Sequence, residues 1–169
     1  MATLILRDTY QELEKEMKTI DKLRTQTALK IQEAASHGDL KENYEYKAAK
    51  EEMEFVIYKK QLFQSHAPFK FIEYNEIETD EIGFGNKITI LEEGKDEPED
   101  YYLLGPIESE LDLYPLVVTY RAPFAQAMLK KKLNEHFLLE INGENIKFTI
   151  VAIEKITADT PKSPKKSFL

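Results

Sequence analysis

The chain is organised around one short stretch, Ala34 to Lys50, which reads AASHGDLKENYEYKAAK. One helical pattern enters this stretch, a second leaves it, and a glycine lies between the two. Gly38 can adopt the left-handed conformation that ends a helix, and Asp39 can accept hydrogen bonds from the free N–H groups that begin the next one. The stretch therefore predicts the tip of a helical hairpin.

The two acids at this tip, Asp39 and Glu42, admit two interpretations. Their spacing is that of a capping box, in which the first residue caps the helix and the second reaches back to it. Alternatively, both carboxylates point outward as ligands of a hard cation such as Mg²⁺, which proteins commonly hold through one or two carboxylates. Nothing else in the hairpin supplies further ligands, so the spacing alone predicts an incomplete metal site.

The sequence before the tip predicts one long helix from about Leu6 to Ser36. Apolar residues recur there at steps of three and four, which is typical of a coiled-coil seam. Polar Arg24 and Thr27 occupy the seam positions in the middle. Such a helix would be roughly 45 Å long, too long for the core of so small a domain, so we expect it to project.

The sequence after the tip predicts a second helix that packs antiparallel against the first. Its predicted seam positions are Tyr44, Ala48, Phe55, Tyr58 and Leu62. Folding the chain back at Gly38 then places Arg24 beside Glu51 or Glu52. We therefore expect a contact between Arg24 and one of these acids to set the register of the hairpin.

Beyond Pro68 the pattern changes from helical to strand-like. Residues 69–82 read as a linker, and Pro123 fits the first turn of a short helix. Asn142-Gly143 is a strong hairpin-turn signal. The strand candidates are residues 87–91, 101–104, 116–120, 136–141 and 146–153. This half therefore predicts a small α+β domain with an antiparallel sheet and one short helix.

Composition excludes several classes of protein. The 169 residues include no cysteine, which rules out disulfides and thiol-based metal sites and suits a cytoplasmic protein. Residues 1–10 lack the features of a signal peptide, and no apolar run approaches the roughly 20 residues of a membrane span. The three histidines are scattered and form no recognisable zinc set, and no glycine-rich nucleotide loop is present.

The net charge of −8 is unevenly distributed. Residues 1–75 hold 12 Lys and Arg against 13 Asp and Glu, whereas residues 76–169 hold 11 against 18. An acidic second half leaves at most weak contact with DNA and is compatible with docking on a basic protein surface. Residues 157–169 form a basic tail rich in proline and serine, which we expect to be disordered.

Residues 37–43, His-Gly-Asp-Leu-Lys-Glu-Asn, followed by Glu45-Tyr46 and Ala-Ala-Lys-Glu at 48–51, resemble the coiled-coil tip of the bacterial Gre transcript-cleavage factors, the GreA-like members in particular. The resemblance implies an antiparallel coiled coil that reaches through the secondary channel of bacterial RNA polymerase. It also implies that Asp39 and Glu42 help to hold a catalytic Mg²⁺ that the polymerase completes. One departure is Tyr44, where the family usually carries a small residue.

The second half resembles the C-terminal domain of the same family, which has an FKBP-like fold and rests on the polymerase. Residues 122–129, Ala-Pro-Phe-Ala-Gln-Ala-Met-Leu, are similar to the family's Ser-Pro-Ile-Ala-Arg-Ala-Leu-Ile. The family's usual Gly-Lys followed by Gly-Asp is replaced around Lys130 to Glu135. The resemblance covers about residues 4–156 and divides the chain into a coiled coil at 1–75, an FKBP-like domain at 76–156 and the tail.

Four residues around the tip are candidates for contact with the RNA 3′ end. Lys47 and Lys50 match basic residues that face RNA in the family, although solvated charge is an equally simple interpretation. Tyr46 can stack on a base or pack against the turn. His37 can contact phosphate, or it can interact with the C-terminal end of the first helix.

The resemblance implies a monomeric transcription elongation factor that activates cleavage by the polymerase and is not itself an enzyme. One alternative is a member that enters the same channel and inhibits or modulates the polymerase without cleavage. A second is a helical-hairpin scaffold or chaperone that never meets polymerase. Prolyl isomerase activity is a further alternative, against which stands the absence of the tryptophan that usually floors such a pocket.

Overall fold

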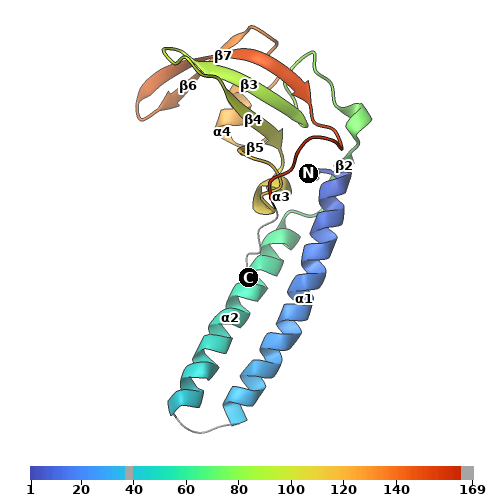
Figure 1. The fold of residues 1–169 in the computed structure, drawn as a ribbon, viewed down its shortest axis with the longest axis vertical. Coiled ribbons are helices and arrows are strands. Elements are labelled where there is room, and N and C mark those ends of the chain that lie inside the picture. Colours follow the sequence, from blue (N-terminus) through green and yellow to red (C-terminus); the bar gives the residue numbers. More distant parts are fainter. Residues whose placement is uncertain (37–39, 165–169) are drawn as a thin grey trace. The chain divides into compact units, whose positions relative to one another are not determined.

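The computed structural model describes residues 1–36 and 40–164 (Figure 1). The chain divides into two compact units. One unit is residues 10–67, and the other combines residues 1–9 with the C-terminal part of the chain from residue 68. Helix α1 (Arg7–Ser36) begins in the second of these units and continues into the first.

The helical unit consists of α1 and α2 (Leu40–Ser65), which lie side by side in Figure 1. Within the helical unit, the buried side chains of α1 recur every seven residues, at Leu13, Ile20, Thr27 and Ala34. Those of α2 recur at the same spacing, at Ala49, Val56 and Phe63. A seven-residue repeat keeps one stripe of each helix facing the other, as in coiled coils. The predicted antiparallel coiled-coil hairpin is therefore confirmed.

The predicted seam of α2 is wrong by one residue. Tyr44, Phe55 and Tyr58, which the periodicity assigned to the seam, are 79%, 41% and 56% exposed. The buried residues Val56 and Phe63 each follow a predicted seam position by one. A shift of one residue rotates the stripe by about 100°. Both stripes have coiled-coil spacing, so only the packing against α1 selects between them.

The predicted contact between Arg24 and the acids of α2 is also wrong. Arg24 is exposed, and half-buried Leu23 occupies the neighbouring position of the seam. Glu52 instead accepts a hydrogen bond from the Thr27 hydroxyl at 3.4 Å and pairs with the Lys30 ammonium at 3.5 Å. The register of the hairpin therefore sets Glu52 against residues three and six positions further along α1 than we predicted.

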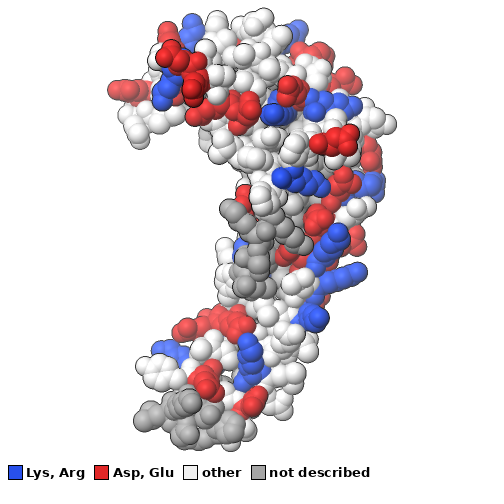
Figure 2. All heavy atoms as spheres, viewed as in Figure 1, with Lys and Arg blue, Asp and Glu red and all other residues white. Residues whose placement is uncertain are grey.

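Acidic and basic side chains alternate over the visible face of the helical unit (Figure 2). Besides the pair between Lys30 and Glu52, Lys60 of α2 pairs with Asp21 of α1 at 2.6 Å. Exposed pairs of this kind contribute little to stability, typically below about 1 kcal/mol each. The near balance of charge explains how two long, thinly covered helices stay side by side without strong repulsion.

The sheet unit contains a five-stranded sheet with the order β5-β4-β3-β7-β6. Its strands are β3 (Asn86–Glu92), β4 (Glu99–Leu104), β5 (Val117–Thr119), β6 (His136–Ile141) and β7 (Glu144–Lys155). All five overlap the predicted strands. Neighbouring strands are antiparallel except β4 and β5, which pair in parallel, a departure from the wholly antiparallel prediction.

The core of this unit lies between the sheet and α4 (Pro123–Met128). Ala125 and Met128 of α4 are fully buried in it, and the rings of Phe137 and Phe148 stack at 5.1 Å between centroids. Asn142 and Gly143 both have positive φ angles, 53° and 81°, as the tight turn between β6 and β7 requires. The predicted short helix and the predicted turn are thus present.

Four elements of the sheet unit were not predicted. Strand β1 (Thr3–Leu6) pairs in parallel with β2 (Phe69–Ile72), and β2 and the 3₁₀ helix η1 (Tyr74–Glu76) lie in the segment that the sequence assigned to a linker. Helix α3 (Pro106–Glu110) follows β4. Each element is only three to five residues long, too short to show a period.

The first part of the predicted tail is also held by the sheet unit. The Ser163 N–H donates to the Leu113 carbonyl at 2.8 Å, and Thr157 and Thr160 close a turn at 3.1 Å. Residues 165–169 lie outside the described residues. None of the helices in the described part of the chain is both long enough and apolar enough to span a membrane.

Candidate functional site at the hairpin tip

The tip predicted at residues 37–44 is only partly described. His37 and Asp39 lie outside the described residues, as does the side chain of Glu42. Helix α2 begins at Leu40, so Asp39 immediately precedes the helix in the chain and Glu42 belongs to its first turn. This placement is compatible with both interpretations of the acids, as caps and as ligands near the positive end of the helix dipole.

The other predicted site residues lie together on the first turns of α2. Tyr46 is half-buried, whereas Lys47 and Lys50 are exposed. The Lys50 ammonium nitrogen lies 5.4 Å from the centre of the Tyr46 ring. A surface hollow of about 430 Å³ is lined by Asn43, Tyr44, Tyr46, Lys47 and Lys50.

This hollow offers two exposed cations beside aromatic rings. Ammonium groups bind phosphate oxygens, and aromatic rings provide faces on which nucleobases stack. The structure therefore brings three of the predicted RNA-contact residues into one place. Sequence reasoning treated Tyr44 as a seam residue and as a departure from the family pattern, but the structure adds its ring to the same hollow.

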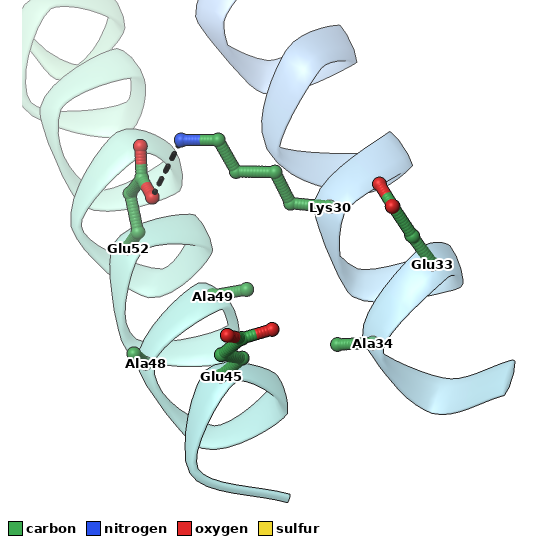
Figure 3. A pocket seen from close by; sticks show the side chains of 7 residues that line it. All are labelled: Lys30, Glu33, Ala34, Glu45, Ala48, Ala49 and Glu52. Carbon is green, nitrogen blue, oxygen red and sulfur yellow. Dashed lines mark ion pairs between the residues drawn. The ribbon is translucent and has the colours of Figure 1, made fainter. Parts of the chain in front are cut away.

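A second hollow, of about 390 Å³, lies between the two helices near the tip (Figure 3). It is lined by Lys30, Glu33, Ala34, Glu45, Ala48, Ala49 and Glu52. The small alanine side chains leave the space open, and the Glu45 carboxylate points across it towards α1. Sequence reasoning missed this hollow, although Ala48, at a predicted seam position and followed by Ala49, was a usable signal.

The acids of the second hollow do not form a metal centre. Lys30 neutralises Glu52 at 3.5 Å. Within the part of the chain that the structure describes, no group of three or more His, Cys, Asp or Glu side chains is arranged to hold a metal ion. Any complete magnesium site at the tip would therefore need ligands from outside the described residues.

The segment that replaces the family's Gly-Lys and Gly-Asp pattern is well anchored. Lys130 and Asn134 have positive φ angles of 67° and 69°. The Lys130 N–H donates to the Ile82 carbonyl at 2.8 Å, and the Asn134 N–H donates to the Ile150 carbonyl at 2.9 Å. The first bond ties the loop to the segment before β3 and the second ties it to β7, so the changed sequence still forms a defined turn.

The protein thus belongs to a class with two parts, a long helical hairpin and a five-stranded sheet domain. The sequence places acids and cations at the tip of the hairpin. Residues 3–60 match the family model described as "Transcription elongation factor, N-terminal", and residues 77–155 match "Transcription elongation factor, GreA/GreB, C-term". The chain belongs to the GreA/GreB family of transcription elongation factors.

Named relatives agree with this assignment. The chain is 31% identical over 149 residues to transcription elongation factor GreA of Limosilactobacillus fermentum, which covers 87% of this chain and 93% of the relative. It is 27% identical over 146 residues to GreA of Thermodesulfovibrio yellowstonii, covering 85% and 91%. The match to GreA of Borreliella burgdorferi is 30% identical and covers 90% of this chain but only 17% of the much longer relative.

Solved structures of similar proteins superimpose only loosely on this chain. The structure described as that of the transcription factor Gfh1 covers 90% of this chain and 97% of its own, with 16% identity and a TM-score of 0.42. A GreA/GreB factor from Nitrosomonas europaea covers 56% of this chain, with 17% identity and a TM-score of 0.39.

Proposed function

We propose that this chain activates RNA cleavage by bacterial RNA polymerase stalled in a backtracked state. The hairpin enters the secondary channel, and its tip reaches the displaced RNA 3′ end. The polymerase carries out the hydrolysis, so the chain is an activator and not itself an enzyme. Membership of the GreA/GreB family supports this proposal. The observation that supports it is that Asp39 and Glu42 directly precede, in the sequence, the residues that line a hollow with two lysines and two tyrosines.

The residues of the tip divide into two groups by their chemistry. Asp39 and Glu42 supply carboxylate oxygens, the ligands that Mg²⁺ prefers. Bound there and completed by the polymerase, this ion would stabilise negative charge on phosphate oxygens and favour attack by water. The chain alone offers too few ligands to enclose Mg²⁺, so the proposed site is shared between the two proteins.

The lysines and tyrosines would hold the RNA in place. Lys47 and Lys50 are exposed cations within one turn of each other, which suits contact with successive phosphates. Tyr46 and Tyr44 line the same hollow, and an unpaired base can stack on an aromatic ring there. We expect the factor to act as a cytoplasmic monomer, with its sheet domain resting on the polymerase surface.

The test uses a purified backtracked complex of the cognate polymerase with 3′-labelled RNA and Mg²⁺. Wild-type protein should shorten the RNA much faster than polymerase alone. Asp39→Ala and Glu42→Ala should compete with wild type for the polymerase yet leave the RNA intact. Glu45→Ala is the matched control, because Glu45 is an acid of the same helix that faces the inter-helix hollow. Normal cleavage by both tip variants would show that the acids are only caps.

A second function is favoured by one observation. Tyr44 is 79% exposed beside the tip, where the family usually carries a small residue. A bulky ring there can fill the space that the RNA end needs, which would make the chain an inhibitor that enters the channel without promoting cleavage. Wild-type protein would then bind and slow the polymerase without cutting, and Tyr44→Ser would gain cleavage activity.

A further inference from the structure

Glu108 is a fully buried carboxylate that the proposed function does not use. It lies on α3 and has no solvent exposure. One carboxylate oxygen accepts a hydrogen bond from the Gly105 N–H at 2.9 Å, at the start of its own helix. The other accepts from the Leu6 N–H at 3.3 Å, and the Thr9 hydroxyl also donates to the carboxylate.

The last two bonds place this carboxylate at the start of α1. Leu6 is the last residue of β1, α1 begins at Arg7, and Thr9 lies in its first turn. The first N–H groups of a helix have no partner within the helix, and a side-chain oxygen that accepts from them stabilises the helix start. Glu108 serves this purpose for α1 from about a hundred residues further along the chain.

Other side chains of the sheet unit hold the same turn of α1. The Tyr74 hydroxyl donates to the Asp8 carboxylate at 2.7 Å, and the Arg7 guanidinium lies 4.7 Å from the centre of the Phe71 ring. These contacts explain why residues 1–9 group with the sheet unit although α1 continues without a break to Ser36.

The packing between α3 and β1 leaves no spare room. A Cβ atom added at Gly105 would lie 2.6 Å from the Leu4 carbonyl oxygen, closer than side chains allow. The Leu4 N–H in turn donates to the Tyr120 hydroxyl at 3.0 Å. Glu108 is therefore held on both sides, by its own helix and by the strand that leads into α1.

Keeping a carboxylate in such a place is unfavourable unless its oxygens are well bonded. Burial raises the pKa of Glu108 above its usual value, and the hydrogen bonds from Thr9, Gly105 and Leu6 oppose that rise. An apolar side chain of similar size would avoid the desolvation but leave the N–H groups of Leu6 and Gly105 without an acceptor. The buried carboxylate therefore contributes by accepting hydrogen bonds from two segments of the chain, and not by apolar packing in a core.

We propose that Glu108 is a positioning residue that fixes the first turn of α1 to the sheet unit. A single continuous helix then transmits the placement of this turn towards the tip. The inference rests on the proposed function in one respect: the tip must be delivered accurately to the RNA end while the sheet domain is docked. In that setting Glu108 acts on cleavage through α1, without touching RNA or metal.

The first experiment measures, in the free protein, how firmly the first turn of α1 is held to the sheet unit. Because the chain has no cysteine, Gln32→Cys and Glu140→Cys, both at exposed positions, give one specific spin label on each unit. Wild-type protein should give a narrow distribution of label-to-label distances, and Glu108→Gln should broaden it. Glutamine keeps the size of the side chain but turns one acceptor into a donor that faces an N–H group. A wild-type distribution that is already broad, or an unchanged one in Glu108→Gln, would overturn the proposal.

Two further variants separate positioning from simple loss of stability. Ile150→Ala destabilises the core of the sheet unit without touching α1, so it should leave the distance distribution narrow. Thr9→Val removes the hydroxyl that donates to Glu108, so it should also broaden the distribution. This variant tests the proposal even if Glu108→Gln does not fold. Equal broadening in Ile150→Ala would reduce Glu108 to an ordinary structural residue.

The second experiment uses the backtracked polymerase complex. Glu108→Gln should leave the concentration for half-maximal effect within about twofold of wild type, while the maximal cleavage rate falls about tenfold, since small misplacements at a reacting centre have effects of this order. A rise in the half-maximal concentration alone would contradict a positioning role. If wild-type protein does not promote cleavage, the proposed function fails. The distance measurement still tests whether Glu108 fixes the first turn of α1 to the sheet unit.

Discussion

The Lys50 ammonium lies over the face of the Tyr46 ring, four residues earlier on α2, with 5.4 Å between the nitrogen and the ring centre. Residues four apart on a helix are neighbours, and an exposed cation–π contact contributes about 0.5–1 kcal/mol. The contact holds a charge and a ring at the hollow that Tyr44, Asn43 and Lys47 complete. A flexible lysine is thereby kept close to the tip.

Removing this charge should weaken cleavage without weakening attachment to polymerase. Lys50→Gln and Lys47→Gln should each lower the rate of RNA cleavage by about tenfold, because each loses a hydrogen bond from a charged group to phosphate. Lys59→Gln is the matched control, since Lys59 also lies over an aromatic ring, Phe55, but further from the tip along α2. Equal loss of cleavage in all three variants would indicate a general effect of charge.

The tip acids should matter little for folding. If they cap α2, Asp39→Ala and Glu42→Ala should lower the free energy of unfolding by about 1 kcal/mol each and leave the helical content unchanged. Circular dichroism during thermal unfolding measures both quantities. A collapse of helical signal at room temperature in either variant would assign the acids a larger structural role than a cap.

The free protein should bind Mg²⁺ weakly. Two carboxylates near a helix start cannot alone enclose an ion that keeps most of its waters. The described residues contain no group of three or more acids or histidines placed to hold a metal. Titration calorimetry should therefore detect no tight site, and stoichiometric binding at micromolar concentration would reveal a complete site within the chain.

The corrected seam of α2 can be tested by a pair of substitutions. Val56 is 2% exposed, so Val56→Ala should lower the free energy of unfolding by about 1.5 kcal/mol through the loss of two buried methyl groups. Tyr58 is 56% exposed, so Tyr58→Ala should change it by less than about 0.5 kcal/mol. Urea unfolding of both variants decides between the two stripes, and the reverse order would restore the seam predicted from sequence.

The sheet unit should lose stability at alkaline pH. Burial, followed by the charges of Glu108 and Asp8, raises the pKa of Tyr114 to about 12, although its hydrogen bond with Tyr74 opposes the rise. An unfolded tyrosine has a pKa of about 10. Between these values the folded state keeps a proton that the unfolded state has lost, so the free energy of unfolding falls as pH rises. Denaturant titrations at several pH values should show this slope, and Tyr114→Phe should reduce it.

Local spacing accounts for most of the elements of this protein. The Asn-Gly pair at 142–143 and the alternating residues 87–91 each specify a conformation within a few residues. Their structures are set by backbone geometry and by which face is apolar. The hairpin, the strands and the short helix after Pro123 were therefore predictable before any contact was known.

Other features depend on partners that are distant in sequence. The stripe of α2 that is buried depends on α1, since two stripes with the same period compete and the larger aromatic rings lie on the exposed one. Strands β1 and β2 exist only as a pair whose members are 66 residues apart in register.

The sequence by itself determined the hairpin, the composition of its tip and the sheet domain, because these follow from periodicity and turn residues over short distances. Only the tertiary structure decided the seam of α2, the gathering of Tyr44, Tyr46 and two lysines around one hollow, and the burial of Glu108 against the start of α1. A carboxylate at position 108 looks like any surface acid in the sequence. Its role depends on the N–H groups that the fold brings to it from the other end of the chain.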